Sequence, residues 1–192
     1  CRLFSRLFEI FRSRSKKNET KEIMEKLLFS GASGFLGHNV MPILSRQYAI
    51  TTIGITESDN INANIASEVP ALPERYDVVL HAAGKAHVYP KNQEEVQAFY
   101  DVNFQGTVNL CRALEKVGLP KSFIFISTLD VYGLAVGEDI DETYPMNPVT
   151  HYAKSKLQAE NFLVEWAKEK GVILGVLRPS LMTGPNPPGN LR

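Results

Sequence analysis

The sequence predicts an α/β protein with a Rossmann-like, doubly wound parallel sheet and helices on both faces. Short apolar segments alternate with longer helical ones along residues 25–192. Strands that are buried on both faces of a parallel sheet form continuous apolar runs of this kind. A glycine-rich turn directly follows the first apolar segment. The length of 192 residues fits one such domain.

Each element is predicted from its own residue pattern. Short apolar or β-branched runs predict strands over residues 26–30, 48–55, 76–81, 122–127 and 172–177. Longer amphipathic runs predict helices over residues 35–46, 94–117 and 149–169, the second of them with a break. Polar residues 56–64 predict a loop, and a second loop is indicated by Pro185, Pro187, Pro188 and Gly189.

The composition narrows the class of protein. Hydrophobic residues make up 44% and charged residues 22%, which is ordinary for a globular protein. The 21 basic and 21 acidic residues cancel, so composition gives no reason to expect a nucleic-acid partner. Cys1 and Cys111 are the two cysteines, which predicts no disulfide framework and favours the reducing cytoplasm. No metal site is predicted, and no apolar run is long enough to span a membrane.

Residues 1–24 are predicted to be a separate N-terminal extension ahead of the Rossmann domain at residues 25–192. The first 17 residues contain six Lys or Arg and one acid, Glu9, with Leu and Phe at helical spacing. A basic amphipathic helix of this kind can lie on an anionic membrane surface. The alternatives are an extension that packs on a partner protein and an artefact of translation or cloning.

The glycine-rich turn is the first candidate binding element. Gly31 allows a tight turn, Gly34 lets the backbone approach a pyrophosphate, and Gly37 lets the helix that follows pack closely on the strand. The backbone N–H groups of Phe35 and Leu36 at the helix start favour phosphate charge. A plain turn is the alternative, but the position between a strand and a helix favours dinucleotide binding.

The end of the second predicted strand bears on the choice of dinucleotide. A carboxylate about 20 residues after the glycines usually binds the adenosine ribose. That position falls near Ile55 or Thr56, and Glu57 and Asp59 stand further along than expected. Because no Lys or Arg lies nearby to hold a 2′-phosphate, NAD is predicted rather than NADP.

Three side chains form a candidate catalytic set. Tyr152 and Lys156 are four residues apart and therefore share one helix face. An ammonium group near a phenol is expected to lower the pKa of the phenol, which would make Tyr152 a base. Ser127 and Thr128 follow a predicted strand, at the edge of a parallel sheet where ligands bind. The alternatives are an ordinary exposed helix pair and a hydroxyl that caps a turn.

Further segments complete a pattern with these motifs: His81-Ala82-Ala83-Gly84, Asn103 in a Val-Asn-Phe-Gln-Gly-Thr segment, Val131-Tyr132-Gly133 after Thr128, and Arg178-Pro179. In this order, over about residues 26–190, the motifs resemble those of the extended short-chain dehydrogenases, the NAD-dependent epimerase/dehydratase family. The resemblance implies that the dinucleotide is held by Gly31, Gly34, Phe35, Leu36, Gly37, Ala82, Ala83, Gly84, Asn103, Tyr152, Lys156 and Pro179.

The resemblance also implies a reaction. Tyr152 would be the base, Lys156 would hold the ribose, and Thr128 would be the catalytic hydroxyl, in a transient oxidation at C4 of a nucleoside-diphosphate sugar used in polysaccharide synthesis. Leu129 stands where the 4,6-dehydratases carry an acid, which favours 4-epimerisation over dehydration. Two alternatives stay open: a non-catalytic dinucleotide-binding fragment and an NADPH-linked keto-sugar reductase.

Family members are longer than this chain. Because the sequence begins with Cys1 and stops after the 186–190 loop, we expect a fragment, a processed product or a truncated reading frame in which the C-terminal sugar-binding domain is largely missing. Members of the family commonly pair through two long helices, so residues 94–117 and 149–169 are the candidates for a homodimer contact.

Overall fold

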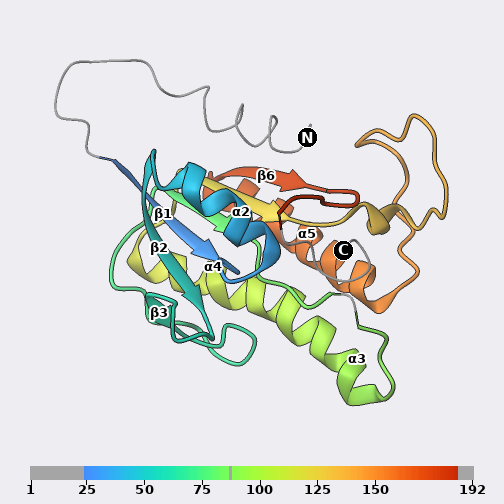
Figure 1. The fold of residues 1–192 in the computed structure, drawn as a ribbon, viewed down its shortest axis with the longest axis horizontal. Coiled ribbons are helices and arrows are strands. Elements are labelled where there is room, and N and C mark those ends of the chain that lie inside the picture. Colours follow the sequence, from blue (N-terminus) through green and yellow to red (C-terminus); the bar gives the residue numbers. More distant parts are fainter. Residues whose placement is uncertain (1–23, 87, 186–192) are drawn as a thin grey trace.

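The computed structural model describes residues 24–86 and 88–185, and nearly all of the predicted extension lies outside them. Within the described residues six parallel strands form one sheet in the order β3-β2-β1-β4-β5-β6 (Figure 1). The strands are β1 (Glu25–Ser30), β2 (Tyr48–Gly54), β3 (Ile61–Asn62), β4 (Val78–His81), β5 (Ser122–Ile126) and β6 (Ile173–Leu177). The predicted doubly wound parallel sheet is confirmed.

The strand order changes direction at the centre of the sheet. The chain runs outward from β1 to β2 and β3, and then returns to place β4 on the other side of β1. Ser30 at the end of β1 is in register with His81 at the end of β4. Ligands of such sheets bind beyond the carboxyl ends of the strands at this switch point, so the fold itself indicates where a site lies.

The helices cover both faces of the sheet. Helix α2 (Phe35–Leu44) lies on one face, while α4 (Gly106–Val117) and α5 (His151–Lys170) lie on the other (Figure 1). Alternate strand residues divide between the two faces: Leu27 packs with the α2 side and Leu28 with the α4–α5 side. This period of two is the geometry of a pleated strand.

The predicted break in the second helix is confirmed. Helix α3 (Gln93–Tyr100) continues into a π-helical turn, η1 (Asp101–Gln105), before α4 begins. Single π-helical turns inside helices are frequent at functional sites. The prediction that residues 56–64 are only loop was wrong, because the short β3 pairs with the end of β2 through Ile53↔Ile61. Two residues of strand leave too little alternation in the sequence to be recognised.

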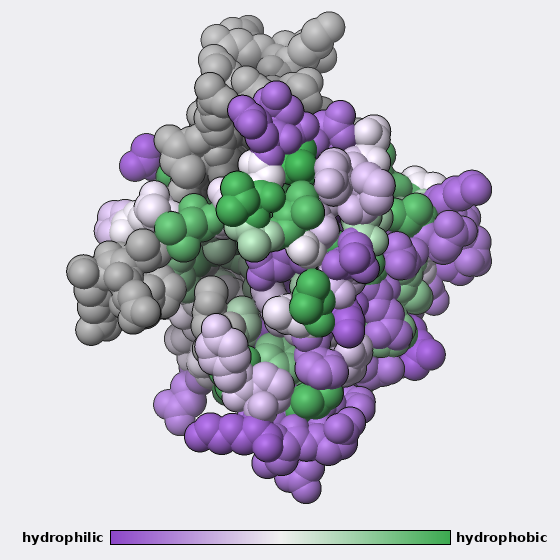
Figure 2. Space-filling view, turned by 90° about the vertical axis from the view of Figure 1, so that its right-hand side faces the viewer, coloured by the Kyte–Doolittle hydropathy of each residue, from purple (hydrophilic) through white to green (hydrophobic). Residues whose placement is uncertain are grey.

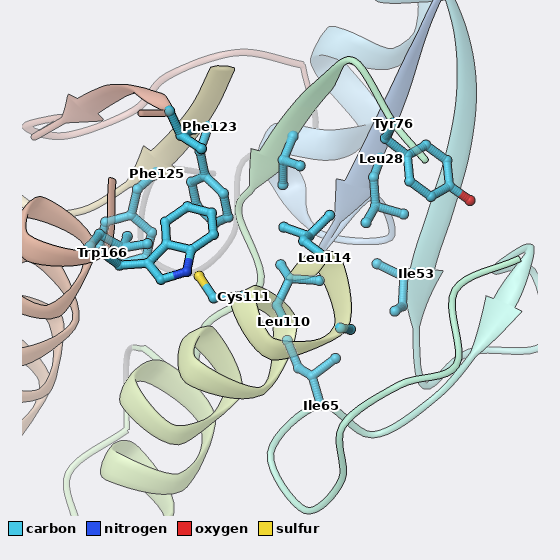
Figure 3. Packing of buried hydrophobic residues seen from close by; sticks show 14 of the residues in the cluster. Leu28, Ile53, Ile65, Tyr76, Leu110, Cys111, Leu114, Phe123, Phe125 and Trp166 are labelled. Atoms are coloured by element: carbon cyan, nitrogen blue, oxygen red, sulfur yellow. The ribbon is translucent and has the colours of Figure 1, made fainter. Parts of the chain in front are cut away.

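The larger core cluster lies between the sheet and the α4–α5 layer (Figure 3). Phe123 on β5 meets Trp166 on α5 edge to face, with ring centroids 5.8 Å apart, and Trp166 donates a hydrogen bond from Nε1 to Glu115 at 2.7 Å. Cys111 is fully buried in this cluster as a free thiol. Aromatic side chains carry much of the apolar area that stabilises such cores, so α5 is held firmly on the sheet.

One side of the molecule carries apolar side chains on loops. Leu134, Val136 and Met146 lie exposed in the segment between η2 (Leu129–Tyr132) and α5. Figure 2 shows hydrophobic patches on this side, broken up by hydrophilic side chains. Within residues 24–86 and 88–185, no helix is long and apolar enough to cross a membrane.

Candidate active site

The glycine turn is built around backbone contacts that exclude side chains. Gly31 has a φ of +79°, and a Cβ atom there would lie 2.5 Å from the backbone nitrogen of Ala83. A Cβ atom on Gly37 would lie 2.0 Å from the carbonyl oxygen of Ala32. Gly37 therefore allows the helix to close on the turn itself, rather than on the strand as the sequence suggested. Both positions require glycine for steric reasons.

The same turn leaves room where a phosphate would approach. A Cβ atom on Gly34 would meet only the carbonyl oxygen of Gly31, at 3.3 Å. Gly34 is also the N-cap of α2 and makes no side-chain capping bond, so the first N–H groups of the helix, those of Phe35 and Leu36, point out of its end. Free N–H groups and the helix dipole favour an anion at this point.

The segment after β4 lies beside this turn. Ala82 donates a backbone hydrogen bond to the carbonyl oxygen of Ser30 at 3.0 Å, and the backbone of Ala83 faces Gly31. A Cβ atom on Gly84 would lie 3.1 Å from Oδ1 of Asn103 and 3.5 Å from Nζ of Lys156. The three predicted small residues therefore separate the glycine turn from Asn103 and the lysine.

Asn103 is fully buried in the π-helical turn and links two other segments through its side-chain amide. Its Nδ2 donates to the carbonyl oxygen of Lys85 at 3.1 Å and to Oγ of Ser155 at 2.9 Å. Its Oδ1 accepts from the backbone N–H of Lys85 at 2.8 Å. The amide thus joins the segment after β4 to α5, which fixes the position of Lys156 beside it. Sequence resemblance indicated the residue but not this bracing.

A second buried polar chain joins β1, β4 and α4. His81 lies between Oγ of Ser30, at 2.5 Å from Nδ1, and Oγ1 of Thr107, at 2.9 Å from Nε2. Thr107 in turn donates to the carbonyl oxygen of Asn103 at 2.8 Å. All four residues are at most 1% exposed. Sequence reasoning missed the Ser30–His81–Thr107 contacts, because they join residues far apart in the chain.

The predicted catalytic residues come together at the carboxyl end of β5. Thr128 follows that strand and is 7% exposed, and its side chain lies close enough to the phenol of Tyr152 on α5 to lower the pKa of that phenol. The ring of Tyr152 packs against Phe99 of α3, with centroids 6.5 Å apart. Lys156 follows one turn later and is 3% exposed, with Nζ 4.2 Å from the ring centroid of Phe125.

Burial dominates the acid–base properties of this set. Desolvation raises the pKa of Tyr152, the side chain of Thr128 lowers it in part, and the charge of Asp130 raises it again. The expectation that Lys156 holds the phenol pKa low is therefore wrong for the protein by itself. Burial also lowers the pKa of Lys156 to about 7, with the charge of Glu160 acting in the opposite direction. A buried lysine loses hydration that an ammonium needs.

Pro179 lies beside the threonine. Its carbonyl oxygen accepts a hydrogen bond from the backbone N–H of Leu129 at 3.1 Å, so the segment after β6 runs along the segment after β5. The preceding residue, Arg178, forms an ion pair with Glu160, with Nη2 and Oε2 2.6 Å apart. Sequence reasoning did not single out Glu160, since only the folded chain brings it to Arg178.

Asp59 is closer to the end of β2 than the sequence spacing suggested. A turn brings its Oδ2 within hydrogen-bond distance of the backbone N–H of Thr56, at 3.1 Å, and of Thr56 Oγ1, at 2.7 Å. A Cβ atom on Gly54 would lie only 2.4 Å from that oxygen. The absence of a side chain at Gly54 lets the carboxylate lie against the strand end. The pairing of Gly54 with Asp59 is the signal in the sequence that could have revealed this.

The residues present fit a dinucleotide. The glycine turn has room for phosphate at Gly34, free helix N–H groups face that room, and a carboxylate lies at the end of β2. The described residues hold no group of three or more His, Cys, Asp or Glu suited to a metal ion.

Comparison with known proteins identifies the family. The model of the NAD dependent epimerase/dehydratase family matches residues 27–192. The chain belongs to this family. The matched range contains the glycine turn, the segment after β4, Asn103, Tyr152 and Lys156.

Two curated relatives illustrate the similarity. N-acetyl-alpha-D-glucosaminyl-diphospho-ditrans,octacis-undecaprenol 4-epimerase of Escherichia coli O157:H7 is 32% identical over 183 residues, covering 87% of this chain and 52% of the relative. UDP-glucose 4-epimerase of Vibrio cholerae is 30% identical over 185 residues, covering 88% of this chain and 56% of the relative. The chain spans about half the length of these curated relatives. Other matched relatives are named as a GDP-6-deoxy-D-mannose reductase and a dTDP-D-glucose 4,6-dehydratase.

A solved structure shows the same architecture. RMD from Pseudomonas aeruginosa, complexed with NADPH, superposes with a TM-score of 0.67 at 30% identity, covering 81% of this chain and 54% of that chain. Relatives in this comparison are named for different reactions, namely epimerisation, reduction and dehydration.

Proposed function

We propose that this chain is the dinucleotide-binding part of an NAD-dependent enzyme that epimerises a nucleoside-diphosphate sugar at C4. The observation that carries the proposal is the approach of Thr128 to the phenol of Tyr152, with Lys156 buried one helical turn further on. This set lies at the carboxyl edge of the sheet, where the glycine turn also ends. Family membership and the two matched 4-epimerases support it.

Each residue has a role in the proposal. Tyr152 takes the proton of the sugar hydroxyl and returns it, and Thr128 holds the phenol and the sugar oxygen in line. Lys156 donates hydrogen bonds to the nicotinamide ribose. Bound NAD supplies the site that accepts and returns hydride, and the positive charge of its oxidised ring favours the phenolate. Because burial raises the pKa of Tyr152, the phenol is neutral until such a charge arrives.

Leu129 favours epimerisation over dehydration. Its side chain is 42% exposed beside the reactive threonine and carries no proton with which to expel water from a sugar. The next residue, Asp130, donates its backbone N–H to Oγ1 of Thr128 at 3.2 Å. Transfer of hydride back to the sugar needs no such acid, so epimerisation or keto-sugar reduction fits this site better.

Asp59 supports NAD over NADP. Its carboxylate at the end of β2 can accept hydrogen bonds from a ribose diol, and it repels the additional charge of a 2′-phosphate. An NADPH-linked keto-sugar reductase is the alternative, and the NADPH-bound relative shows that the family includes NADP users.

Calorimetric titration with NAD and NADP, followed by assays with UDP-glucose and UDP-N-acetylglucosamine, tests the proposal. We expect saturable binding that is tighter for NAD. Tyr152→Phe should lower turnover by about 100-fold or more, and Tyr89→Phe, the same change at a residue 93% exposed, should not. Binding without turnover would favour the alternative of a non-catalytic dinucleotide-binding fragment. Binding of NADP that is tighter than that of NAD would favour the alternative, an NADPH-linked keto-sugar reductase.

A lipid-linked sugar is a second candidate substrate. One relative is named for a sugar carried on undecaprenol diphosphate, and six basic residues lie among the first 17 of this chain. Basic residues placed among Leu and Phe favour an anionic membrane surface. Sedimentation with vesicles containing anionic lipid, for the whole chain and for a variant with these six residues neutralised, would test this candidate.

We also propose that the enzyme is a cytoplasmic homodimer. The pairing surface would lie along α3, η1, α4 and α5, where the partly buried Phe104 of η1 and Phe162 of α5 meet edge to face with centroids 6.3 Å apart. Analytical ultracentrifugation of the whole chain, and of a Phe162→Glu variant, would test the dimer. A dimer unaffected by the substitution would place the contact elsewhere.

A further inference from the structure

Glu160 is a buried carboxylate that accepts hydrogen bonds from two side chains. It is 2% exposed and lies on α5. Oγ of Ser127 donates to its Oε1. Arg178 donates from Nε to both carboxylate oxygens at 3.2 Å, and from Nη2 to Oε2 at 2.6 Å. A paired guanidinium of this kind fixes geometry as well as charge.

The partners of Glu160 directly precede two proposed site residues. Ser127 comes before Thr128 at the end of β5, and Arg178 comes before Pro179 at the end of β6. Lys156 lies one turn before Glu160 on the same helix. The carboxylate therefore lies where α5 meets two strand ends, and each of the three elements carries a proposed site residue.

Arg178 extends the connection. Its Nη1 donates to the hydroxyl of Tyr132 at 2.7 Å, and its guanidinium lies 5.1 Å from the centroid of that ring. Apolar residues of similar volume often stabilise a core as well as a buried ion pair does. A buried pair that joins three site-bearing elements is therefore better explained by positioning than by stability alone.

Charge is the second contribution of Glu160. Two titratable groups interact electrostatically with Lys156 in the described residues: Glu160 on α5 is a cause of its pKa shift, and the charge of Lys156 in turn acts on His81 at the end of β4. Burial lowers the pKa of His81 to about 3, so this ring is neutral near pH 7. Glu160 is then the group that raises the pKa of Lys156 against the effect of burial.

We propose that Glu160 is a positioning residue of the dinucleotide site, holding α5 against the ends of β5 and β6 so that Lys156, Thr128 and Pro179 keep their relative places. Its negative charge also favours the ammonium form of Lys156, which is the form that donates hydrogen bonds to a ribose. The inference deepens the proposed function and rests on it for the role of Lys156.

Glu160→Gln separates charge from shape, because glutamine is nearly isosteric. The first measurement is the ¹³Cε chemical shift of Lys156 against pH in the whole, cofactor-free chain. We expect a midpoint near 7 in the native protein and a lower one in the variant. The second measurement is NADH affinity by fluorescence. A midpoint lower by about one unit reduces affinity roughly tenfold at about pH 8 and roughly twofold at about pH 6.

The control is Glu165→Gln, the same change on the exposed side of α5, which should alter neither measurement. An unchanged Lys156 midpoint, or an equal loss of affinity at both pH values, would overturn the electrostatic role of Glu160. If the native chain binds no NADH, the proposed function fails, while the lysine midpoint still decides whether Glu160 acts on Lys156.

Glu160→Asp covers the case in which the glutamine variant does not fold. Aspartate keeps the charge and shortens the side chain by one methylene group, so the ties to Ser127 and Arg178 are strained. We expect a lysine midpoint close to the native one and NADH affinity that is reduced to a similar degree at both pH values. Native affinity in this variant would refute the positioning role.

Discussion

His81 makes the stability of this fold depend on pH in a defined way. The ring is 0% exposed and is hydrogen bonded to Ser30 and Thr107. It also packs on Phe125, with centroids 5.6 Å apart. Burial is the main reason that its pKa falls from 6.5 to about 3, and the charge of Lys156 adds to the effect.

The size of the effect follows from this shift. Below pH 6.5 the unfolded chain binds a proton at His81 that the folded chain refuses, so stability decreases as pH falls and the loss ends near pH 3. At about 1.4 kcal/mol for each pH unit, the folded state loses about 2 kcal/mol between pH 7 and pH 5. Over the whole interval from pH 6.5 to about pH 3, the loss of stability amounts to roughly 5 kcal/mol.

Urea unfolding at pH 7 and pH 5, for the native chain and for His81→Asn, measures this contribution. Asparagine keeps a polar group near Ser30 and Thr107 but does not titrate. We expect the difference in unfolding free energy between the two pH values to be about 2 kcal/mol smaller in the variant. The lowered pKa values of Asp77 and Asp141 act below pH 4 and do not interfere. The same pH dependence in both proteins would refute the assignment.

Three further substitutions test other parts of the structure. Gly31→Ala should lower the free energy of unfolding by about 1–3 kcal/mol and abolish dinucleotide binding, because the new Cβ would lie 2.5 Å from the backbone nitrogen of Ala83. Gly171→Ala is the control: this residue also has a positive φ but lies in open space, so dinucleotide binding should stay intact. Asp59→Asn should reduce the preference for NAD over NADP roughly tenfold in calorimetry, and an unchanged ratio would exclude Asp59 from the ribose site. Leu163→Ala should cost about 2–5 kcal/mol in thermal unfolding, against less than about 1 kcal/mol for exposed Val164→Ala.

Much of the architecture could be predicted because it depends on local sequence patterns. The strands at 26–30 and 122–127 are continuous apolar runs, and the glycine turn lies where a strand gives way to a helix. Even the break before α4 was visible, although its π-helical form was not. Spacing also placed Tyr152 and Lys156 on one helix and Thr128 at a strand end, and the structure has them there.

The remaining features depend on contacts between distant residues. Nothing near Glu160 in the sequence identifies Arg178 as its partner, and the Ser30–His81 contact joins residues 51 positions apart. The prediction for Tyr152 failed for a related reason: helical spacing brings Lys156 near, but burial decides the direction of the pKa shift. The sequence spacing suggested that Asp59 lies too far along the chain from the end of β2, but a turn brings its carboxylate back to Thr56.

The central pairing of β1 with β4 has a consequence for how the chain acquires its fold. Ser30 meets His81, so the middle of the sheet cannot close until β2, β3 and the segment after them have been made. During synthesis the glycine turn leaves the ribosome early but has no Ala83 backbone to lie against. Pairing of distant strands is slow relative to local helix formation. The phosphate-binding turn is therefore expected to take its final shape late in folding, together with the centre of the sheet.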